Sequence, residues 1–406
     1  MIRAFRSANY RLFWSGSFVS NVGFWMQNVA LGWLVFDMTK RASLLGTISF
    51  CGNLPFLVLG LVGGAVADRA SRRAVMLGAQ AILAAAAFVL AFLTATGRIA
   101  IWHIVAIAMV DGVTNAVYTP VMQAVIPSLV PEADLLNAVS LNSVQFNLAR
   151  MIGPVVAGLV YAEIGASGCF TINAVSFLVL AVALAYVRVA PRPAGSRPPM
   201  GRAVRDGLRY ARTHEVIWPA LGLSAALSLF GFPYIILMPA LARTALGLDV
   251  SGYGLLMAPV GAGAVLGGLL LSAAGDVRRK GLVAAICATA FGLLLATLAV
   301  VRTPHGVAAL FFVMGALQVT CVASLNTTIQ LTVDDGMRGR VMSMLTVILF
   351  GFITIGGVVL GTLGDWIGIA RALALGGVVV AVAGTTALAR AEALVAPVSR
   401  AARVAA

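Results

Sequence analysis

The chain has 406 residues, of which 61% are hydrophobic and only 10% are charged, and its formal net charge at pH 7 is +14. Soluble globular proteins carry about 25% charged residues, so the composition excludes a soluble fold and indicates a protein whose solvent is lipid. The basic residues fall in short segments between apolar runs. We therefore expect them to set membrane topology and to contact anionic lipid, and we expect no nucleic-acid partner.

Apolar runs follow one another along the chain, and each is long enough to cross a bilayer as a helix, which takes about 20 residues. The first run continues to about Phe36, which is too long for the core of a signal peptide, so we interpret it as a retained span. The sequence predicts an all-α membrane protein of twelve transmembrane helices with both chain ends on one side. The runs lie at about 12–36, 44–67, 74–96, 101–124, 138–161, 167–189, 215–240, 252–275, 281–301, 306–331, 340–363 and 367–389.

The lysines and arginines fall unevenly on the two sides of the predicted membrane. Of the 28, 21 lie on the side of the chain ends, six lie on the other side, and Arg150 lies inside a span. Loops rich in basic residues stay in the cytoplasm. We therefore expect cytoplasmic termini and a multi-pass protein of the cytoplasmic (inner) membrane.

The longest hydrophilic stretch, 190–213, falls at the middle of the chain. Its first part is rich in proline and resists regular structure. Its second part, 202–212, reads as a short basic amphipathic helix on the membrane surface. We predict an N-terminal six-helix bundle over 1–189, a cytoplasmic linker over 190–213, and a C-terminal six-helix bundle with a short tail over 214–406.

The two halves are related in sequence. Gly112 and Gly153 of the first half fall on Gly315 and Gly356 of the second at an offset of 203. The loops also follow in the same order, so duplication of a six-helix unit is the better interpretation. Two such units imply a cavity between them that opens to each side in turn.

A dense group of charges separates the second and third runs. It reads Gly64-Ala-Val-Ala-Asp68-Arg69-Ala-Ser-Arg72-Arg73. Four charges in so short a turn cannot sit in lipid, and the excess of arginine favours the cytoplasmic face. The spacing G-x-x-x-D-R-x-x-R-R resembles the signature of the major facilitator superfamily, and every specified position matches. The resemblance implies that this is a gating motif whose aspartate engages the start of the eleventh helix.

Three further stretches narrow the resemblance. They lie at 5–14, at 120–154 and at 334–343. Together they resemble the branch called transmembrane secretion effectors, which includes enterobactin-exporter-like proteins. That branch consists mostly of exporters, so the resemblance implies the major facilitator fold, with two pseudo-symmetric six-helix bundles, and export powered by the proton gradient.

The fifth span partly matches the antiporter motif of the same superfamily. It carries Gly153, Pro154 and Gly158, but Ala149 and Ala157 stand where the motif has glycine. A simpler interpretation stays equally open, because Gly and Pro in spans let helices approach closely or kink.

Asp111 is the only acidic residue in mid-span, and Arg150 is the only basic one. A charge at the bilayer centre costs about 3 kcal/mol on insertion scales, so such residues face a cavity or a partner. An ion pair between adjacent antiparallel helices is feasible here. Two interpretations stay open: a structural pair that locks two helices, or a protonatable acid that couples protons to substrate while Arg150 controls its charge.

Polar and aromatic side chains gather on single faces of several spans. The resemblance implies that spans one, four, seven and ten line the cavity, although any one of these side chains could instead join helices by hydrogen bonds. In span seven, Phe230, Phe232 and Tyr234 could stack on a substrate or serve packing. The candidate cavity residues are Asn21, Trp25 and Asn28 on the first span, Asn115 and Tyr118 on the fourth, Asn147 on the fifth, and Gln318 and Asn326 on the tenth.

The sequence predicts a secondary active transporter, a proton-coupled exporter of a siderophore, a drug or a metabolite that works by alternating access. An importer or facilitator, and a non-transporting membrane sensor on the same fold, stay open as alternatives. We expect no enzyme activity, no cofactor and no metal, since no catalytic cluster can be named and the four cysteines lack ligand spacing. The expected partners are the small-molecule substrate, protons and the lipid bilayer, and we expect a functional monomer.

Overall fold

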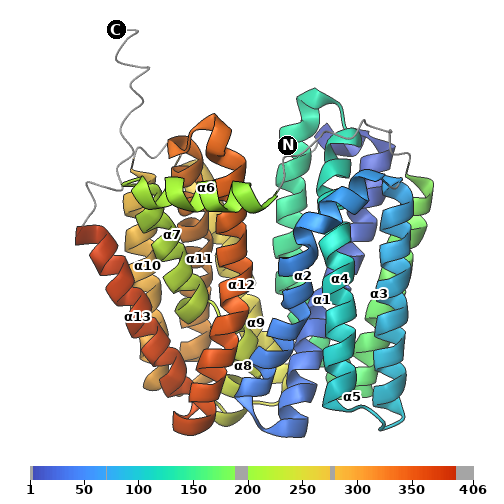
Figure 1. Cartoon of the computed structure of the whole chain (residues 1–406). Helices are drawn as coiled ribbons and strands as arrows, with labels where there is room; N and C mark the ends of the chain where they lie inside the picture. The colour runs from blue at the N-terminus through green and yellow to red at the C-terminus, as the bar shows by residue number, and fades with distance from the viewer. Residues whose placement is uncertain (1–2, 70, 188–199, 275–278, 390–406) are drawn as a thin grey trace.

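The computed structural model is all-helical, and α6 lies across one end of the other helices (Figure 1). It describes residues 3–69, 71–187, 200–274 and 279–389, with the backbone alone for 60–69 and 200–206. The first half contains α1 (Ala8–Thr39), α2 (Ala42–Arg69), α3 (Arg72–Ala95), α4 (Ile101–Val125) and α5 (Leu135–Tyr186). After α6 (Met200–Thr213), the second half contains α7 (Ile217–Ala226), α8 (Tyr234–Thr244), α9 (Val250–Ala273), α10 (Lys280–Ala296), α11 (Pro304–Thr332), α12 (Asp335–Ile367) and α13 (Ile369–Ala389).

These helices supply the twelve predicted spans. In the part of the chain that the structure describes, ten helical segments are long and apolar enough to cross a membrane. One of them holds two spans, because Gly165 breaks α5 with φ 71° and ψ −174°, a left-handed φ that glycine adopts readily. The remaining span is α1, in which Asn21, Gln27 and Asn28 lower the hydropathy. The predicted all-α, twelve-helix fold is confirmed.

The seventh span is interrupted near its middle. α7 continues into a π-helical turn, Leu227–Gly231, and α8 begins at Tyr234 directly after Pro233. π-helical turns inside α-helices are rare, and those that occur are often found at functional sites. The break places the first residue of α8 deep inside the bundle, where Tyr234 is fully buried.

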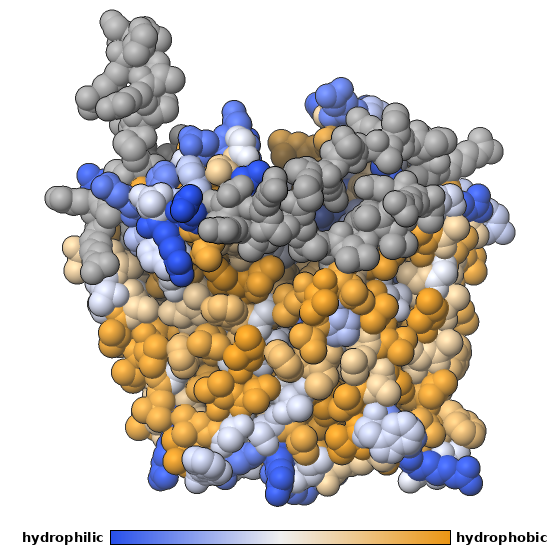
Figure 2. Space-filling model, viewed as in Figure 1, coloured by the Kyte–Doolittle hydropathy of each residue, from blue (hydrophilic) through white to orange (hydrophobic). Residues whose placement is uncertain are grey.

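The molecule has two polar ends and an apolar middle. We call the end where α6 lies the linker face, and the opposite end, with the turn at 40–41 and Gly368, the distal face (Figure 1). Figure 2 shows an apolar band between hydrophilic residues at both ends. Large apolar side chains such as Phe92, Leu159 and Leu269 are exposed, as expected where lipid covers the surface.

Helices within each half approach closely at glycines. Gly112 of α4 lies against the carbonyl of Gly52 on α2, and Gly315 of α11 lies against the carbonyl of Val260 on α9. A Cβ at either glycine would collide with that carbonyl oxygen. Gly112 and Gly315 recur at the offset of 203, so equivalent positions make equivalent contacts in the two halves.

The linker helix α6 is fixed to the second half. The Tyr210 hydroxyl donates to a carboxylate oxygen of Asp334 at 3.0 Å, and the Asp334 N–H donates to the Tyr210 oxygen at 3.2 Å. Gly207 lies against Arg340. Since Asp334 directly precedes α12, α6 is attached to the start of the helix that reaches the first half at its other end.

Candidate functional site

The two halves meet mainly along two pairs of helices, α2 with α12 and α5 with α9, and α8 of the second half also contacts α1 and α2. The closest of these contacts lie in the distal part of each pair. Gly46 lies against the backbone of Gly357, and Gly254 lies against Gly158 and the carbonyl of Pro154. The distal side is therefore closed by direct contact between backbones.

A carboxylate of the second half caps a helix of the first. Asp365, near the end of α12, accepts a hydrogen bond from the N–H of Ala42 at 2.6 Å and one from the N–H of Ser43 at 3.3 Å. The Ser43 hydroxyl donates to the same carboxylate at 2.5 Å. The first N–H groups of a helix have no partner within it, and an acid there is also favoured by the helix dipole. We call Asp365, Ala42 and Ser43 the distal latch.

The distal latch was not predicted, although the sequence contains a signal for it. Gly361 and Asp365 repeat the Gly-x-x-x-Asp spacing of Gly64 and Asp68 in the gating motif. A Cβ at Gly361 would lie 2.7 Å from the Ala42 carbonyl oxygen, so the glycine lets α12 reach the start of α2. This Gly-x-x-x-Asp spacing lies at the distal end of the eleventh span, where Asp365 falls between the apolar runs 340–363 and 367–389.

The predicted gating motif is described only in part. Only the backbone is described for Gly64, Asp68 and Arg69. Arg72 Nη1 donates to the carbonyl of Ala124 at 3.3 Å, and Arg73 Nη2 donates to the carbonyl of Ala185. These two arginines therefore tie the start of α3 to the ends of α4 and α5 at the linker face.

Arg150 lies near the middle of the fifth span and is stacked on a tryptophan. Its guanidinium carbon is 5.6 Å from the centroid of the Trp25 ring on α1. The Nε and Nη2 atoms are buried without a hydrogen-bond partner, and so is Nε1 of Trp25. Gly153, one turn later, holds this geometry, because a Cβ there would lie 2.9 Å from the Val22 carbonyl oxygen of α1.

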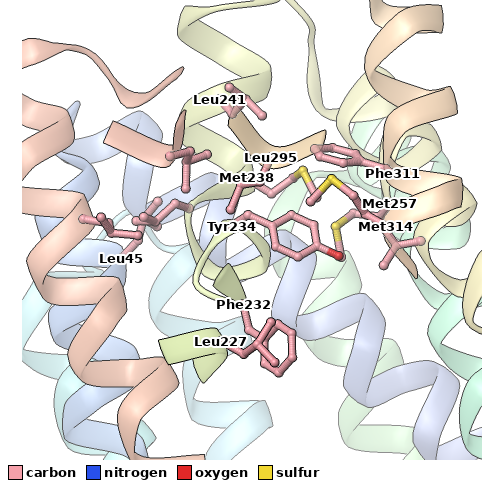
Figure 3. Packing of buried hydrophobic residues seen from close by; sticks show 14 of the residues in the cluster. Leu45, Leu227, Phe232, Tyr234, Met238, Leu241, Met257, Leu295, Phe311 and Met314 are labelled. Atoms are coloured by element: carbon pink, nitrogen blue, oxygen red, sulfur yellow. The ribbon is translucent and has the colours of Figure 1, made fainter. Parts of the chain in front are cut away.

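Two side chains of the second half complete this group. Tyr234 of α8 lies in the neighbourhood of Arg150, and its hydroxyl donates to Oε1 of Gln318 on α11 at 3.3 Å. Figure 3 shows the Tyr234 ring among Met238, Met257, Met314 and Phe311. We call Trp25, Arg150, Tyr234 and Gln318 the Arg150 cluster. Its residues lie on two helices of each half.

The structure does not form the ion pair between Asp111 and Arg150 that the sequence makes feasible. α4 packs on α2 and α3, whereas α5 packs on α1, α3 and α9. Gly112 fits α4 against α2, and Gly153 fits α5 against α1, so the fourth and fifth spans are drawn to different partners. No ion pair joins Asp111 to Arg150, and no described side chain forms an ion pair with Asp111.

The other candidate cavity residues are satisfied mostly within their own helices. The side-chain amides of Asn28, Asn115 and Asn147 each donate to the carbonyl four residues earlier, at 2.8–2.9 Å. Asn326 accepts from Gln330 on the next turn at 2.8 Å. Asn21 is half-buried and Tyr118 is buried. In these described contacts the side-chain amides do not join separate helices.

The fifth-span motif lies between helices. Pro154 and Gly158 face Gly254 of α9, and the Ser251 hydroxyl donates to the Gly158 carbonyl at 3.2 Å. Gly153 faces α1. These contacts are of the kind that the packing interpretation requires, and two of the three residues belong to the closed distal interface.

Comparison with known proteins identifies relatives. A family described as "Transmembrane secretion effector" matches residues 2–399. The staphyloferrin A transporter of Staphylococcus aureus is 26% identical over 91% of this chain and 92% of its own. Macrolide efflux protein A of Streptococcus pyogenes is 25% identical over 66% and 67%. The enterobactin exporter EntS of Shigella boydii is 23% identical over 67% and 65%.

Solved structures share the fold at low sequence identity. A bacterial homologue of the human lysosomal transporter Spinster, in an inward-facing, unoccupied conformation, superposes with a TM-score of 0.75 at 12% identity, over 95% of this chain and 97% of that one. A POT family transporter in complex with 5-aminolevulinic acid gives 0.77 at 12% identity, over 95% and 96%. The predicted superfamily, and its secretion-effector branch, are confirmed.

We predict that Asp365→Ala weakens the distal closure. Loss of a helix cap costs about 0.5–2 kcal/mol, so the state with the distal side open should gain about fivefold in population. The readout is the maleimide alkylation rate of Ser251→Cys in purified protein without native cysteines, because Ser251 is part of the closed interface between α5 and α9.

The matched control is Asp37→Ala. Asp37 is also at the distal end of a span, but its carboxylate pairs with Lys40 of the same half. Its removal should leave the alkylation rate unchanged. Equal rates for the two variants would show that the distal latch does not hold the halves together.

Proposed function

We propose that this chain, which belongs to the transmembrane secretion effector family of the major facilitator superfamily, exports small organic molecules by alternating access. As a member of that family it is a multi-pass membrane transporter and not an enzyme. The relatives named above transport staphyloferrin A, or are named for the efflux of macrolides and the export of enterobactin. A siderophore, a drug or a related metabolite is therefore the proposed cargo.

The observation that carries the proposal is the one-sided contact between the halves. They touch through glycines and the distal latch at one end, while the Arg150 cluster lies near mid-depth. Rocking of two bundles about a site near the bilayer midplane is the mechanism that such folds use. We propose that residues 1–189 and 214–406 are the two moving units and that 190–213 joins them.

We propose that the linker face is cytoplasmic, in the inner membrane, because 21 of the 28 basic residues lie on that side. Single cysteines test this in intact cells. Lys40→Cys should react with an impermeant maleimide, and Arg338→Cys should react only after the membrane is opened. Reaction of Arg338→Cys in sealed cells would reverse the topology.

We propose that Asp68 holds the opposite state. By analogy with Asp365, Asp68 would cap the first N–H groups of α12 when the linker face closes. The neighbouring Arg69 would stabilise the Asp68 carboxylate there. Asp68→Asn should then lower the alkylation rate of Ser251→Cys, which Asp365→Ala is expected to raise. An unchanged or higher rate would contradict this role for the gating motif.

The test of export compares a deletion strain with a complemented one by mass spectrometry of cell extracts and medium. The deletion strain should retain a compound that complemented cells release, and a protonophore should reproduce the retention. A deletion that lowers the uptake of a nutrient would instead indicate an importer, and a deletion without any change in transport would favour a sensor.

The same assay tests proton coupling through Asp111. It is the mid-span acid, and no described side chain forms an ion pair with it, so its charge can respond to a proton. Complementation with Asp111→Asn should not restore gradient-driven export, although purified protein should still bind substrate. The control is Glu163→Gln, at an exposed position near the distal end of the fifth span, which should export normally; full export by Asp111→Asn would exclude the coupling role.

A further inference from the structure

The buried guanidinium of Arg150 lacks partners along one edge. Nε and Nη2 are the unpartnered atoms, and their N–H bonds point the same way as a fork that matches the two oxygens of a carboxylate. A charged group buried without an acceptor is strongly unfavourable. Among the described residues, no carboxylate forms an ion pair with Arg150.

The neighbouring tryptophan adds a donor of the same kind. Nε1 of Trp25 is also buried without a partner, and an indole N–H can only donate. The Tyr234 hydroxyl already donates its hydrogen bond to Gln318. The Arg150 cluster therefore presents three unpaired donors from two side chains, so the missing groups are acceptors.

The cluster lies where a ligand would touch both halves. Trp25 and Arg150 belong to the first half, and Tyr234 and Gln318 belong to the second. Immediately on the distal side, a Cβ at Gly261 of α9 would lie 2.9 Å from Met151, so α5 and α9 are closed against each other there. A ligand that enters from the linker face would stop at Arg150.

We propose that the Arg150 cluster is an anion subsite that takes a carboxylate of the transported molecule, an inference that rests on the transport proposed above. The carboxylate accepts from Nε and Nη2 of Arg150 and from the indole of Trp25. The apolar part of the molecule packs on the Trp25 and Phe146 rings, whose centroids lie 5.8 Å apart. The cargo class is thus organic carboxylates, whereas a cation would meet the like charge of Arg150.

The experiment measures thermal unfolding of the purified protein in detergent at constant ionic strength. The probes are benzoate, the neutral benzamide of the same shape, and benzylammonium as the cation. A ligand that binds only the folded protein raises its unfolding temperature. Benzoate should raise it in a concentration-dependent manner, and benzamide and benzylammonium should not.

Variants assign the effect to Arg150. Arg150→Met removes a buried, unpaired charge and should unfold at a higher temperature than the unliganded parent protein, with at least about tenfold weaker benzoate response, since it loses the bidentate pair. Arg150→Lys keeps the charge without the fork and should respond to an intermediate degree. The control is Arg243→Gln, because Arg243 lies at the same 5.6 Å from a tryptophan ring, that of Trp33, but is exposed.

Two outcomes would overturn the subsite. Either benzoate does not stabilise the parent protein, or it stabilises Arg150→Met equally. If, in addition, Arg150→Met unfolds at a lower temperature than the parent, Arg150 is a structural clamp on Trp25. The assay requires no transport, so a failed export test with intact benzoate binding would contradict the proposed function and leave the subsite standing.

Discussion

Close contact between backbones at glycine is the interaction on which this structure depends. Lipid tails are as apolar as leucine, so spans gain little by burying apolar side chains against each other and associate instead by close packing. Gly112 on α4 and Gly315 on α11 show this within the halves. The same kind of contact closes the distal side, where Gly46 meets Gly357. The packing of helices inside a half and the closure between the halves therefore both depend on backbone contact at glycine.

The glycine contacts inside a half and those between the halves differ in how easily water can replace them. The glycines inside a half face other spans at the depth of the lipid. The distal interface ends at the surface, and its cap, Asp365, is exposed. When the halves part, water can satisfy both the carboxylate and the first N–H groups of α2, so opening leaves no orphaned polar group. A cap worth about 0.5–2 kcal/mol stabilises closure without making it permanent.

The amino-acid sequence was sufficient to predict the spans and the superfamily, because both depend on short, continuous stretches of sequence. An apolar run of the right length predicts a span by itself, and the charged turn at 64–73 is recognised without knowledge of any residue outside it. The distal latch and the Arg150 cluster are different, since each joins residues from opposite halves of the chain. Asp365 and Ala42 are 323 positions apart, and only the packing of helices decides that they meet.

The absence of a contact between Asp111 and Arg150 has the same origin. Depth in the membrane follows from position along a span, and both residues were placed near mid-span. Which helices contact each other does not follow from their order in the chain, because each helix packs on the neighbour against which its glycines allow a close approach. Gly112 turns α4 toward α2, and Gly153 turns α5 toward α1. Similar depth in the membrane therefore does not imply contact.

The separation of the two charges suggests how a proton and a substrate would act on one gate. Asp111 is next to Gly112, whose backbone rests on Gly52 of α2. α2 begins at the distal latch, so a change of charge at Asp111 would act on the helix that Asp365 caps. Arg150 is next to Met151, where α5 meets Gly261 of α9. If Asp111 carries the proton and Arg150 binds the substrate, as proposed above, the proton would act on the α2–α12 pair and the substrate on the α5–α9 pair, and both pairs join the same two bundles.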